Sequence, residues 1–239
     1  MDVAIVTVGD ELLSGDTENT NATWLGRQLS DRGVRVARVL TVPDDVEVVG
    51  DAVGRYSAAF DAVVVTGGLG GTPDDVTMAG VAAGFDRSLA VNELAREDLE
   101  RTLAAIAEDY PDLDVDVEAE ASLPAGARPL LNEEGLSPGC VVENVYVLPG
   151  IPREMRAMFE QVADEFAGDV ETRSFYTREP EANLIDRLAE ARDRFGVVVG
   201  CYPDRDAGHN RLKVSGDDPA ALDDAVAWLR EHVEVATVD

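Results

Sequence analysis

The first two thirds of the chain alternate short apolar runs with segments whose apolar residues recur at helical spacing. Near-continuous apolar runs at residues 3–8, 34–42 and 62–66 predict strands that are buried on both faces. Residues 21–32 and a second segment that ends near Ser57 carry the helical pattern between these runs. Strands that alternate with helices in this way predict an α/β fold with a doubly wound, mostly parallel sheet in three layers.

Beyond the third strand the pattern becomes less regular. Residues 92–110 predict a long exposed helix, and residues 112–120 an acidic connector. Short apolar runs within residues 128–148 predict a hairpin that leads back into the sheet, and Pro152 then occupies the first turn of another helix.

The pattern changes again near Gly168, which predicts a domain boundary. We expect one α/β domain over residues 1–168 and a small α+β domain over residues 169–239. Strand-like and helical stretches between residues 171 and 233 support the second domain, and residues 204–206 are expected in a solvated loop.

The formal net charge of −28 limits the classes of partner. A surface this acidic repels nucleic-acid phosphates and anionic membranes, so neither is expected as a partner. Because the acidic residues are spread along the chain, we also expect a halophilic protein whose self-repulsion is screened by molar salt. Thermal melts at low and at molar salt test this, and equal stability in both would contradict it.

Neither a membrane segment nor a disulfide framework is expected. The chain has no stretch of about 18 uncharged apolar residues, and Met1 leads directly into the first predicted strand, so a cytoplasmic location is expected. Cys140 and Cys201 lie far apart in the sequence without metal-ligand spacing, and both are interpreted as core thiols.

One glycine-rich segment follows the third predicted strand and precedes a helix. It reads Thr66-Gly67-Gly68-Leu69-Gly70-Gly71-Thr72-Pro73-Asp74-Asp75-Val76-Thr77. Glycines permit close backbone approach and leave amide hydrogens available, and a helix N-terminus favours an anion. The segment therefore predicts a phosphate site, with a tight turn capped by Asp74 or Asp75 as the structural alternative.

Acidic side chains also follow the first two predicted strands. Asp10 lies in the segment Gly9–Gly15, and Asp44 follows Pro43. Carboxylates that converge beside a phosphate repel it unless a divalent cation lies between them, so we expect Mg²⁺ or a similar hard ion at this edge. Asp10, Asp44 and Asp75 are the candidate metal ligands and catalytic residues. The alternative is that Asp10 and Asp44 (or its neighbour Asp45) cap helices or are solvated.

Four ordered motifs over about residues 3–166 resemble the N-terminal domain of the CinA family. They are Gly9-Asp10-Glu11-Leu12-Leu13-Ser14-Gly15 with Asn21, the glycine loop through Asp75-Val76-Thr77, Asn132 with Ser137-Pro138-Gly139, and Leu148-Pro149-Gly150-Ile151-Pro152-Arg153-Glu154-Met155. The MogA and MoaB families share a looser version of this pattern. The resemblance implies a MogA-like three-layer fold, and the tail from about residue 170 resembles the small domain of archaeal relatives and of eukaryotic FAD synthases.

The resemblance also implies roles for individual residues. Asp44 and Asp75 fall where molybdopterin adenylyltransferases place functional aspartates, and residues 67–72 fall where these enzymes hold phosphate. The substrate-binding residues carried over are Gly67, Gly68, Leu69, Gly70, Gly71, Thr72, Asp74, Thr77, Asn21, Asn132, Pro149, Gly150 and Arg153. For the turn that ends at Arg153, the alternative is a purely structural strand-to-helix connection.

Three positions depart from the related patterns. Asp74 stands where the adenylyltransferases usually have arginine, and the Asp74-Asp75 pair is the CinA form. Gly71 replaces the proline that is usual in the CinA loop, and Leu136 replaces a usual threonine. These departures bear on how a substrate is positioned.

The resemblance implies a metal-dependent nucleotide pyrophosphatase that cleaves dinucleotide phosphoanhydrides such as ADP-ribose or FAD. The alternatives are a molybdopterin adenylyltransferase or molybdopterin-binding protein of molybdenum cofactor biosynthesis, and a binding module without catalysis. In each case the ligand is a small nucleotide or pterin, with molybdopterin itself as one candidate. Relatives usually self-associate, so a homo-oligomer, a dimer or a trimer, is expected.

Overall fold

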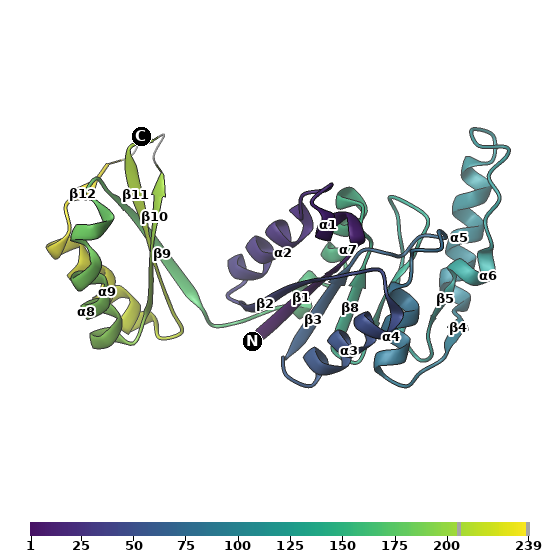
Figure 1. The fold of residues 1–239 in the computed structure, drawn as a ribbon, viewed down its shortest axis with the longest axis horizontal. Helices are drawn as coiled ribbons and strands as arrows, with labels where there is room; N and C mark the ends of the chain where they lie inside the picture. Colours follow the sequence, from purple (N-terminus) through teal and green to yellow (C-terminus); the bar gives the residue numbers. More distant parts are fainter. Residues whose placement is uncertain (205–206, 238–239) are drawn as a thin grey trace. The chain divides into compact units, whose positions relative to one another are not determined.

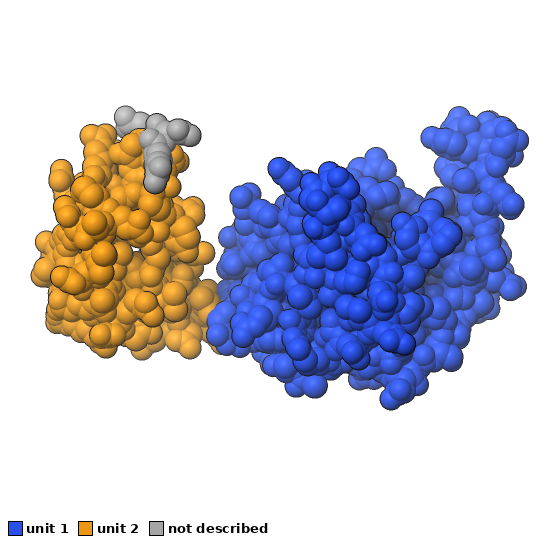
Figure 2. All heavy atoms as spheres, in the orientation of Figure 1, with its two compact units in different colours: residues 1–167 blue, residues 168–239 orange. Residues whose placement is uncertain are grey.

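The computed structural model describes residues 1–204 and 207–237, and the chain forms two compact units, residues 1–167 and 168–239 (Figure 2). Arg205 and Asp206, which the sequence assigns to a solvated loop, lie outside the described ranges. The sequence places the boundary between the domains after residue 168.

The first unit is built on a six-stranded sheet (Figure 1). Its strand order is β2 (Arg35–Val42), β1 (Asp2–Val8), β3 (Ala62–Thr66), β8 (Val145–Leu148), β7 (Gly139–Val142) and β6 (Arg128–Leu130). The first four strands are parallel, and β7 and β6 continue the sheet in antiparallel pairing. The loops that follow β1, β2, β3 and β8 therefore all lie at one edge of the sheet.

Helices cover both faces of this sheet (Figure 1). The core on one face contains Val3 and Ile5 with side chains of α2 (Thr20–Asp31) and α7 (Pro152–Glu160). The alternate residues Ala4 and Val6 pack on the other face with side chains of α3 (Val46–Ser57) and α4 (Thr77–Gly84). This alternation explains the continuous apolar runs, because each buried strand supplies two cores. The predicted three-layer, mostly parallel α/β fold is confirmed.

Several short elements of the first unit were not predicted. They are α1 (Asp10–Ser14), the antiparallel pair β4 (Leu89–Val91) and β5 (Ser122–Pro124), and η1 (Ala163–Glu165). The long helix α5 (Glu93–Ile106) begins at the cap Asn92 and ends four residues before the predicted end. The acidic connector was wrong in its last residues, which form the helix α6 (Val117–Glu120), capped by the Asp116 side chain.

The second unit is a small α+β fold, as predicted. Its antiparallel sheet has the order β10 (Val198–Asp204), β11 (His209–Gly216), β9 (Glu171–Thr177) and β12 (Val235–Ala236). Its helical elements are η2 (Glu181–Asn183), α8 (Ile185–Phe195) and α9 (Pro219–His232). They pack on the sheet around a separate core that includes Phe175, Leu212 and Leu229.

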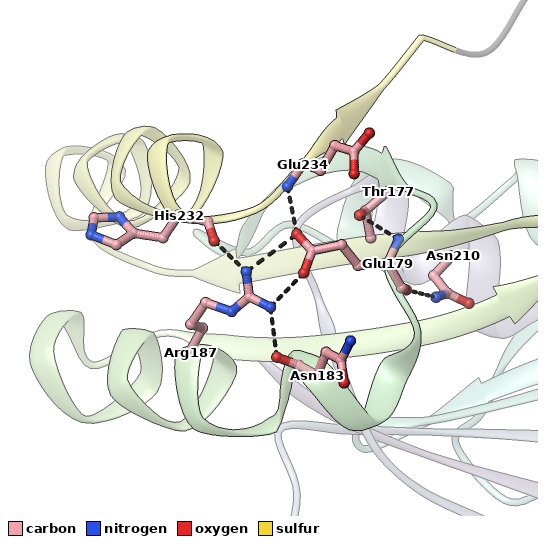
Figure 3. A network of polar contacts seen from close by, with 7 residues as sticks. All are labelled: Thr177, Glu179, Asn183, Arg187, Asn210, His232 and Glu234. Atoms are coloured by element: carbon pink, nitrogen blue, oxygen red, sulfur yellow. Dashed lines mark hydrogen bonds and ion pairs between the residues drawn. The ribbon is translucent and has the colours of Figure 1, made fainter.

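A polar network ties the ends of these elements together (Figure 3). Arg187 on α8 donates to Glu179 at 2.5 Å, to the Asn183 carbonyl oxygen at 2.6 Å and to the His232 carbonyl oxygen. The backbone amide of Glu234 also donates to the Glu179 carboxylate, at 2.6 Å. The Arg187 guanidinium, and then this amide, hold the pKa of Glu179 below its usual value. We call these contacts the Glu179–Arg187 network.

The two cysteines differ in their surroundings. Cys140 is fully buried, and burial raises the pKa of its thiol to about 12. Cys201 is only partly buried and packs against the core of the second unit, so the interpretation as a core thiol holds in part for this residue. None of the helices in the described ranges has the length and apolar character needed to span a membrane.

Candidate functional site

A cavity of about 290 Å³ lies at the edge of the sheet where the parallel strands end. Its walls come from four loops, each following a different strand, and include Gly9 after β1, Asp44 after β2, Gly68 after β3 and Gly150 after β8. These loops are separated by up to 141 residues between Gly9 and Gly150 in the sequence, and the parallel pairing alone brings them together. We call this the first cavity.

The glycine loop after β3 approaches its neighbours closely. Gly67 has φ +108°, and a Cβ atom at this position would overlap the carbonyl oxygen of Val8 on the adjacent strand. Gly68 also has a positive φ, of +57°. Glycine adopts both conformations more readily than residues that carry a side chain. Both residues line the first cavity, so the loop backbone forms part of its wall.

Several backbone amides of this loop are left without a hydrogen-bond partner in the part of the chain that the structure describes. Within residues 1–204 and 207–237, the amides of residues 68–71 donate no hydrogen bond to another residue. Asp75 accepts hydrogen bonds from the Thr72 amide at 3.0 Å and from Thr72 Oγ1 at 2.5 Å, which folds the loop back on itself. Helix α4 follows Val76 without a side-chain cap. Asp75 therefore closes the tight turn, as the structural alternative expects, although neither Asp74 nor Asp75 caps the helix that follows.

Asp10 after β1 and Asp44 after β2 are predicted to meet in one site, but only the Asp44 carboxylate lines the first cavity. Asp45, rather than Asp44, caps α3 by accepting from the amides of Glu47 and Val48. Asp44 instead lines the first cavity and accepts a hydrogen bond from the Asp10 amide at 2.8 Å. The Asp10 side chain is exposed and is not part of the cavity wall, whereas its neighbour Glu11 is. Helix α1 thus turns Asp10 so that its backbone, not its carboxylate, faces Asp44.

Two buried polar atoms near the cavity lack partners in the described part of the chain, Thr77 Oγ1 and Asn21 Oδ1. Thr77 Oγ1 lies 2.6 Å from the position of a Cβ on Gly68, and Asp44 Oδ1 lies 3.7 Å from the same point. Asn21 donates through Nδ2 to the Gly150 carbonyl oxygen at 2.7 Å, which leaves its Oδ1 as an acceptor. Unsatisfied polar atoms are costly to bury, so they favour a ligand that completes them.

The other predicted substrate-binding residues are divided between the cavity and the protein interior. Asp74 lines the first cavity, Pro149 is buried, and Leu69 belongs to the hydrophobic core. Asn132 is 3% exposed and donates to the Ser137 carbonyl oxygen at 2.9 Å and to Glu154 at 2.8 Å, so it holds its own loop. The structure does not bring Leu69 or Asn132 into the first cavity.

Arg153 is also outside the first cavity. Its side chain is 72% exposed and pairs with the Glu134 carboxylate at 3.0 Å and the Glu134 carbonyl oxygen at 2.7 Å. The three remaining predicted residues, Gly70, Gly71 and Thr72, line neighbouring hollows on the glycine loop.

Sequence reasoning missed Glu120, the last residue of α6. Its Oε2 accepts a hydrogen bond from Ser137 Oγ at 3.1 Å, and its Oε1 lies 2.5 Å from the position of a Cβ on Gly71. Burial raises the pKa of Glu120, the Ser137 hydrogen bond opposes this, and the charges of Asp75 and Asp116 raise it further. In so acidic a chain, no local pattern distinguishes this glutamate from its neighbours.

The predicted metal ligands do not form a preassembled site. Among residues 1–204 and 207–237, no three His, Cys, Asp or Glu side chains are placed to hold a metal ion together. Asp44 and Asp75 do line the first cavity. The space that a Cβ on Gly68 would fill lies near both Thr77 Oγ1 and Asp44 Oδ1. Mg²⁺ is often bound through one or two carboxylates together with substrate phosphates, and two carboxylates fit this mode.

Comparison with known proteins identifies both units. Residues 4–168 match the family described as probable molybdopterin binding domain, and residues 159–239 match the FAD synthase middle domain. A protein of Archaeoglobus fulgidus is 35% identical over 233 residues, covering 97% of each chain. A CinA-like protein of Gemmatimonas aurantiaca is 37% identical over 98% of this chain, which spans 58% of that protein.

The solved structures include one with clear overall likeness. The crystal structure of the protein CinA from Thermoplasma acidophilum, described as having unknown function, matches with a TM-score of 0.60 and 34% identity. The match covers 70% of this chain and 99% of that one. The chain therefore belongs to the family described as probable molybdopterin binding domain and has CinA-like proteins among its relatives, and its residues 159–239 are similar to the FAD synthase middle domain.

Proposed function

We propose that this protein is a metal-dependent nucleotide pyrophosphatase that hydrolyses the phosphoanhydride of dinucleotides such as ADP-ribose or FAD. The observation that carries the proposal is the set of unbonded amides at residues 68–71 beside two carboxylates, Asp44 and Asp75, at one edge of the sheet. Amides that are already fixed in place stabilise phosphate charge without reorganising during the reaction. The match to the FAD synthase middle domain is compatible with a dinucleotide substrate.

The residues divide the work between binding and water activation. The loop amides hold the phosphates, and Asn21 Oδ1 accepts a hydrogen bond from a hydroxyl or amine of the ligand. Asp75 Oδ2 already accepts a hydrogen bond from Thr72. Asp44 Oδ1 lies near the space beside Gly68, so Asp44 orients the attacking water and takes its proton. Water attacks one phosphorus and the bridging oxygen leaves with the other phosphate, which yields AMP and ribose phosphate from ADP-ribose.

A divalent cation held by Asp44 and Asp75 would neutralise phosphate charge. Asp10, whose carboxylate lies outside the cavity wall, contributes only by orienting Asp44 through its backbone amide. This assignment replaces the three-aspartate set that the sequence predicts.

A second candidate uses the same site with a different acceptor. The family description names molybdopterin, which favours adenylyl transfer to a pterin phosphate, or molybdopterin binding, as the alternative. A third candidate is a binding module that holds the nucleotide without cleaving it.

A substrate panel separates these functions. ADP-ribose, FAD and ATP with molybdopterin are incubated with several divalent metals in high salt, and the products are identified. We expect AMP from ADP-ribose. Adenylylated pterin as the sole product supports transfer, and tight binding without any product supports the binding module; either result contradicts the proposed hydrolysis.

Asp75→Asn tests the site within the same assay. The asparagine oxygen can still accept from the Thr72 amide, so the loop should keep its shape while the charge is lost. We expect AMP release to fall by about 100-fold or more with little change in melting temperature. Asp164→Asn removes one exposed charge outside the cavity and serves as the control. Full activity in Asp75→Asn removes this residue from the mechanism.

A further inference from the structure

A second cavity, of about 550 Å³, lies on the other end of the glycine loop. The first cavity is bounded by Gly67 and Gly68, whereas the second is bounded by Gly70, Gly71 and Thr72. The two cavities share no lining residue. The loop with its unbonded amides therefore contributes its first residues to one cavity and its last residues to the other.

The walls of the second cavity differ in character from those of the first. Apolar side chains line part of it: Val115, Leu136 and Ile151. The polar part is acidic, with Asp114, Asp116 and Glu120. Apolar walls suit the faces of sugar and heterocycle rings, and carboxylates accept hydrogen bonds from hydroxyl and amine groups.

Glu120 is the carboxylate that reaches the loop. Its Oε2 is fixed by the hydrogen bond from Ser137 Oγ, and its Oε1 lies at Gly71. Glu120 is only partly exposed, so its charge is screened less by salt than that of an exposed acid. A further phosphate that extends past Gly71 into the second cavity would lie beside this carboxylate and be repelled.

Gly71 makes this approach possible. A Cβ on residue 71 would lie 2.5 Å from Glu120 Oε1. A larger residue would therefore push the Glu120 side chain away from the loop. The closeness of Glu120 to the loop amides therefore depends on glycine at position 71.

We propose that the second cavity binds the uncharged, hydroxyl-bearing half of the substrate and that Glu120 is its specificity-determining residue. Glu120 accepts hydrogen bonds from sugar hydroxyls and excludes a further phosphate. The inference rests on the proposed function, because it places the phosphoanhydride on the amides between the cavities. It predicts tighter binding of a nucleoside diphosphate that carries a sugar, such as ADP-ribose, than of a nucleoside triphosphate.

Calorimetric titration with ADP-ribose and with ATP, at one salt concentration, tests this preference. ATP carries a third phosphate where ADP-ribose carries ribose. We expect the wild type to bind ADP-ribose at least about tenfold more tightly, and Glu120→Gln to narrow this ratio at least about fivefold. Glu118→Gln removes the same charge from the same helix outside the cavity and should leave the ratio within about twofold of the wild type.

Gly71→Ala gives an independent route, because the added Cβ displaces Glu120 without removing its charge. Gly71→Ala should also reduce the preference for ADP-ribose over ATP. An unchanged ratio in both Glu120→Gln and Gly71→Ala, or an equal change in Glu118→Gln, overturns the inference alone. A wild type that binds neither nucleotide overturns the proposed function and the inference with it. Binding without AMP release contradicts only hydrolysis, and the ratio then still decides the role of Glu120.

Discussion

Among the described residues, several polar groups are unpaired at the carboxyl edge of the first unit's sheet, whereas those in the Glu179–Arg187 network of the second unit are paired with one another. At the edge, Thr77 Oγ1, Asn21 Oδ1 and the amides of residues 68–71 have no partner in the described parts of the chain. In the network, the Arg187 guanidinium and the Glu179 carboxylate each bind several groups (Figure 3). Both arrangements are specific, but only the second is complete without a ligand.

The difference shows how the two regions use the same kind of atoms. Paired polar groups fix the chain ends of a small fold whose core alone supplies limited stability. Unpaired groups and positive-φ glycines cost stability, and such costs are commonly found where a ligand is bound. We therefore expect substitutions at the edge to affect binding and substitutions in the network to affect folding, with Gly67 as an instructive exception.

Gly67→Ala should have the largest effect on stability. The substitution places a Cβ against the Val8 carbonyl oxygen at a φ of +108°, so the two strands must separate. We expect the first unit to lose about 3 kcal/mol or more of its free energy of unfolding. Gly15→Ala is the matched control, because Gly15 has φ +80° with open space around it, and should cost about 1 kcal/mol.

The two tryptophans allow each unit to be followed separately, since Trp24 lies in the first and Trp228 in the second. Denaturant unfolding of Gly67→Ala is measured by Trp24 fluorescence in a Trp228→Phe background. A loss no greater than that of Gly15→Ala would show that the close approach to Val8 does not constrain the loop.

Arg187→Met should have the next largest effect, confined to the second unit. Within the described ranges it leaves the Glu179 carboxylate, 18% exposed, with only the Glu234 amide as a donor, and it removes the bonds to two carbonyl oxygens. We expect a loss of about 2 kcal/mol. The measurement is Trp228 fluorescence in a Trp24→Phe background, and an unfolding midpoint equal to that of the parent contradicts the role of the network.

The pH dependence of the second unit gives a smaller signal. The pKa of Glu179 is lowered in the folded protein from its ordinary value of 4.5 by Arg187 and the Glu234 amide. Its stabilising contribution is therefore present above pH 4.5 and is lost as the pH falls through the folded-state pKa. The wild type should lose more stability on acidification below this pH than Glu179→Gln does. If the wild type and Glu179→Gln lose stability equally as the pH falls, this assignment is contradicted.

Arg153→Met should have the smallest effect on stability. Its ion pair with Glu134 is exposed, and such pairs contribute about 0.5 kcal/mol or less. The same variant tests the sequence-based assignment of Arg153 to substrate binding. ADP-ribose affinity within about twofold of the wild type contradicts that assignment, and a larger loss supports it.

The layers of the fold could be predicted because each depends on a local pattern. Alternate residues such as Ala4 and Ile5 enter different cores, which requires the continuous apolar run seen in the sequence. The pair β4 and β5 could not be predicted, because three-residue strands 31 to 35 residues apart in the sequence are defined only by their pairing. Helix α6 is similarly short and acidic like its surroundings.

The site was predictable as a set of loops but not as a set of side chains. Strand order brings the loops after β1, β2, β3 and β8 together, and Asp44, Gly68 and Gly150 line one cavity there. The orientation of Asp10 depends on the short helix α1, and that of Leu69 on the core beneath the loop. Glu120 reaches the loop only through the tertiary position of α6.

Phosphate binding by the loop amides is tested most directly by backbone amide NMR of ¹⁵N-labelled protein during titration with inorganic pyrophosphate. We expect the amide resonances of residues 68–71 to shift and saturate together, while those of Gly196 and Gly216 in the second unit do not move. Saturable binding that leaves the loop amides unshifted, or shifts only residues elsewhere, would contradict the claim that these amides hold the phosphates.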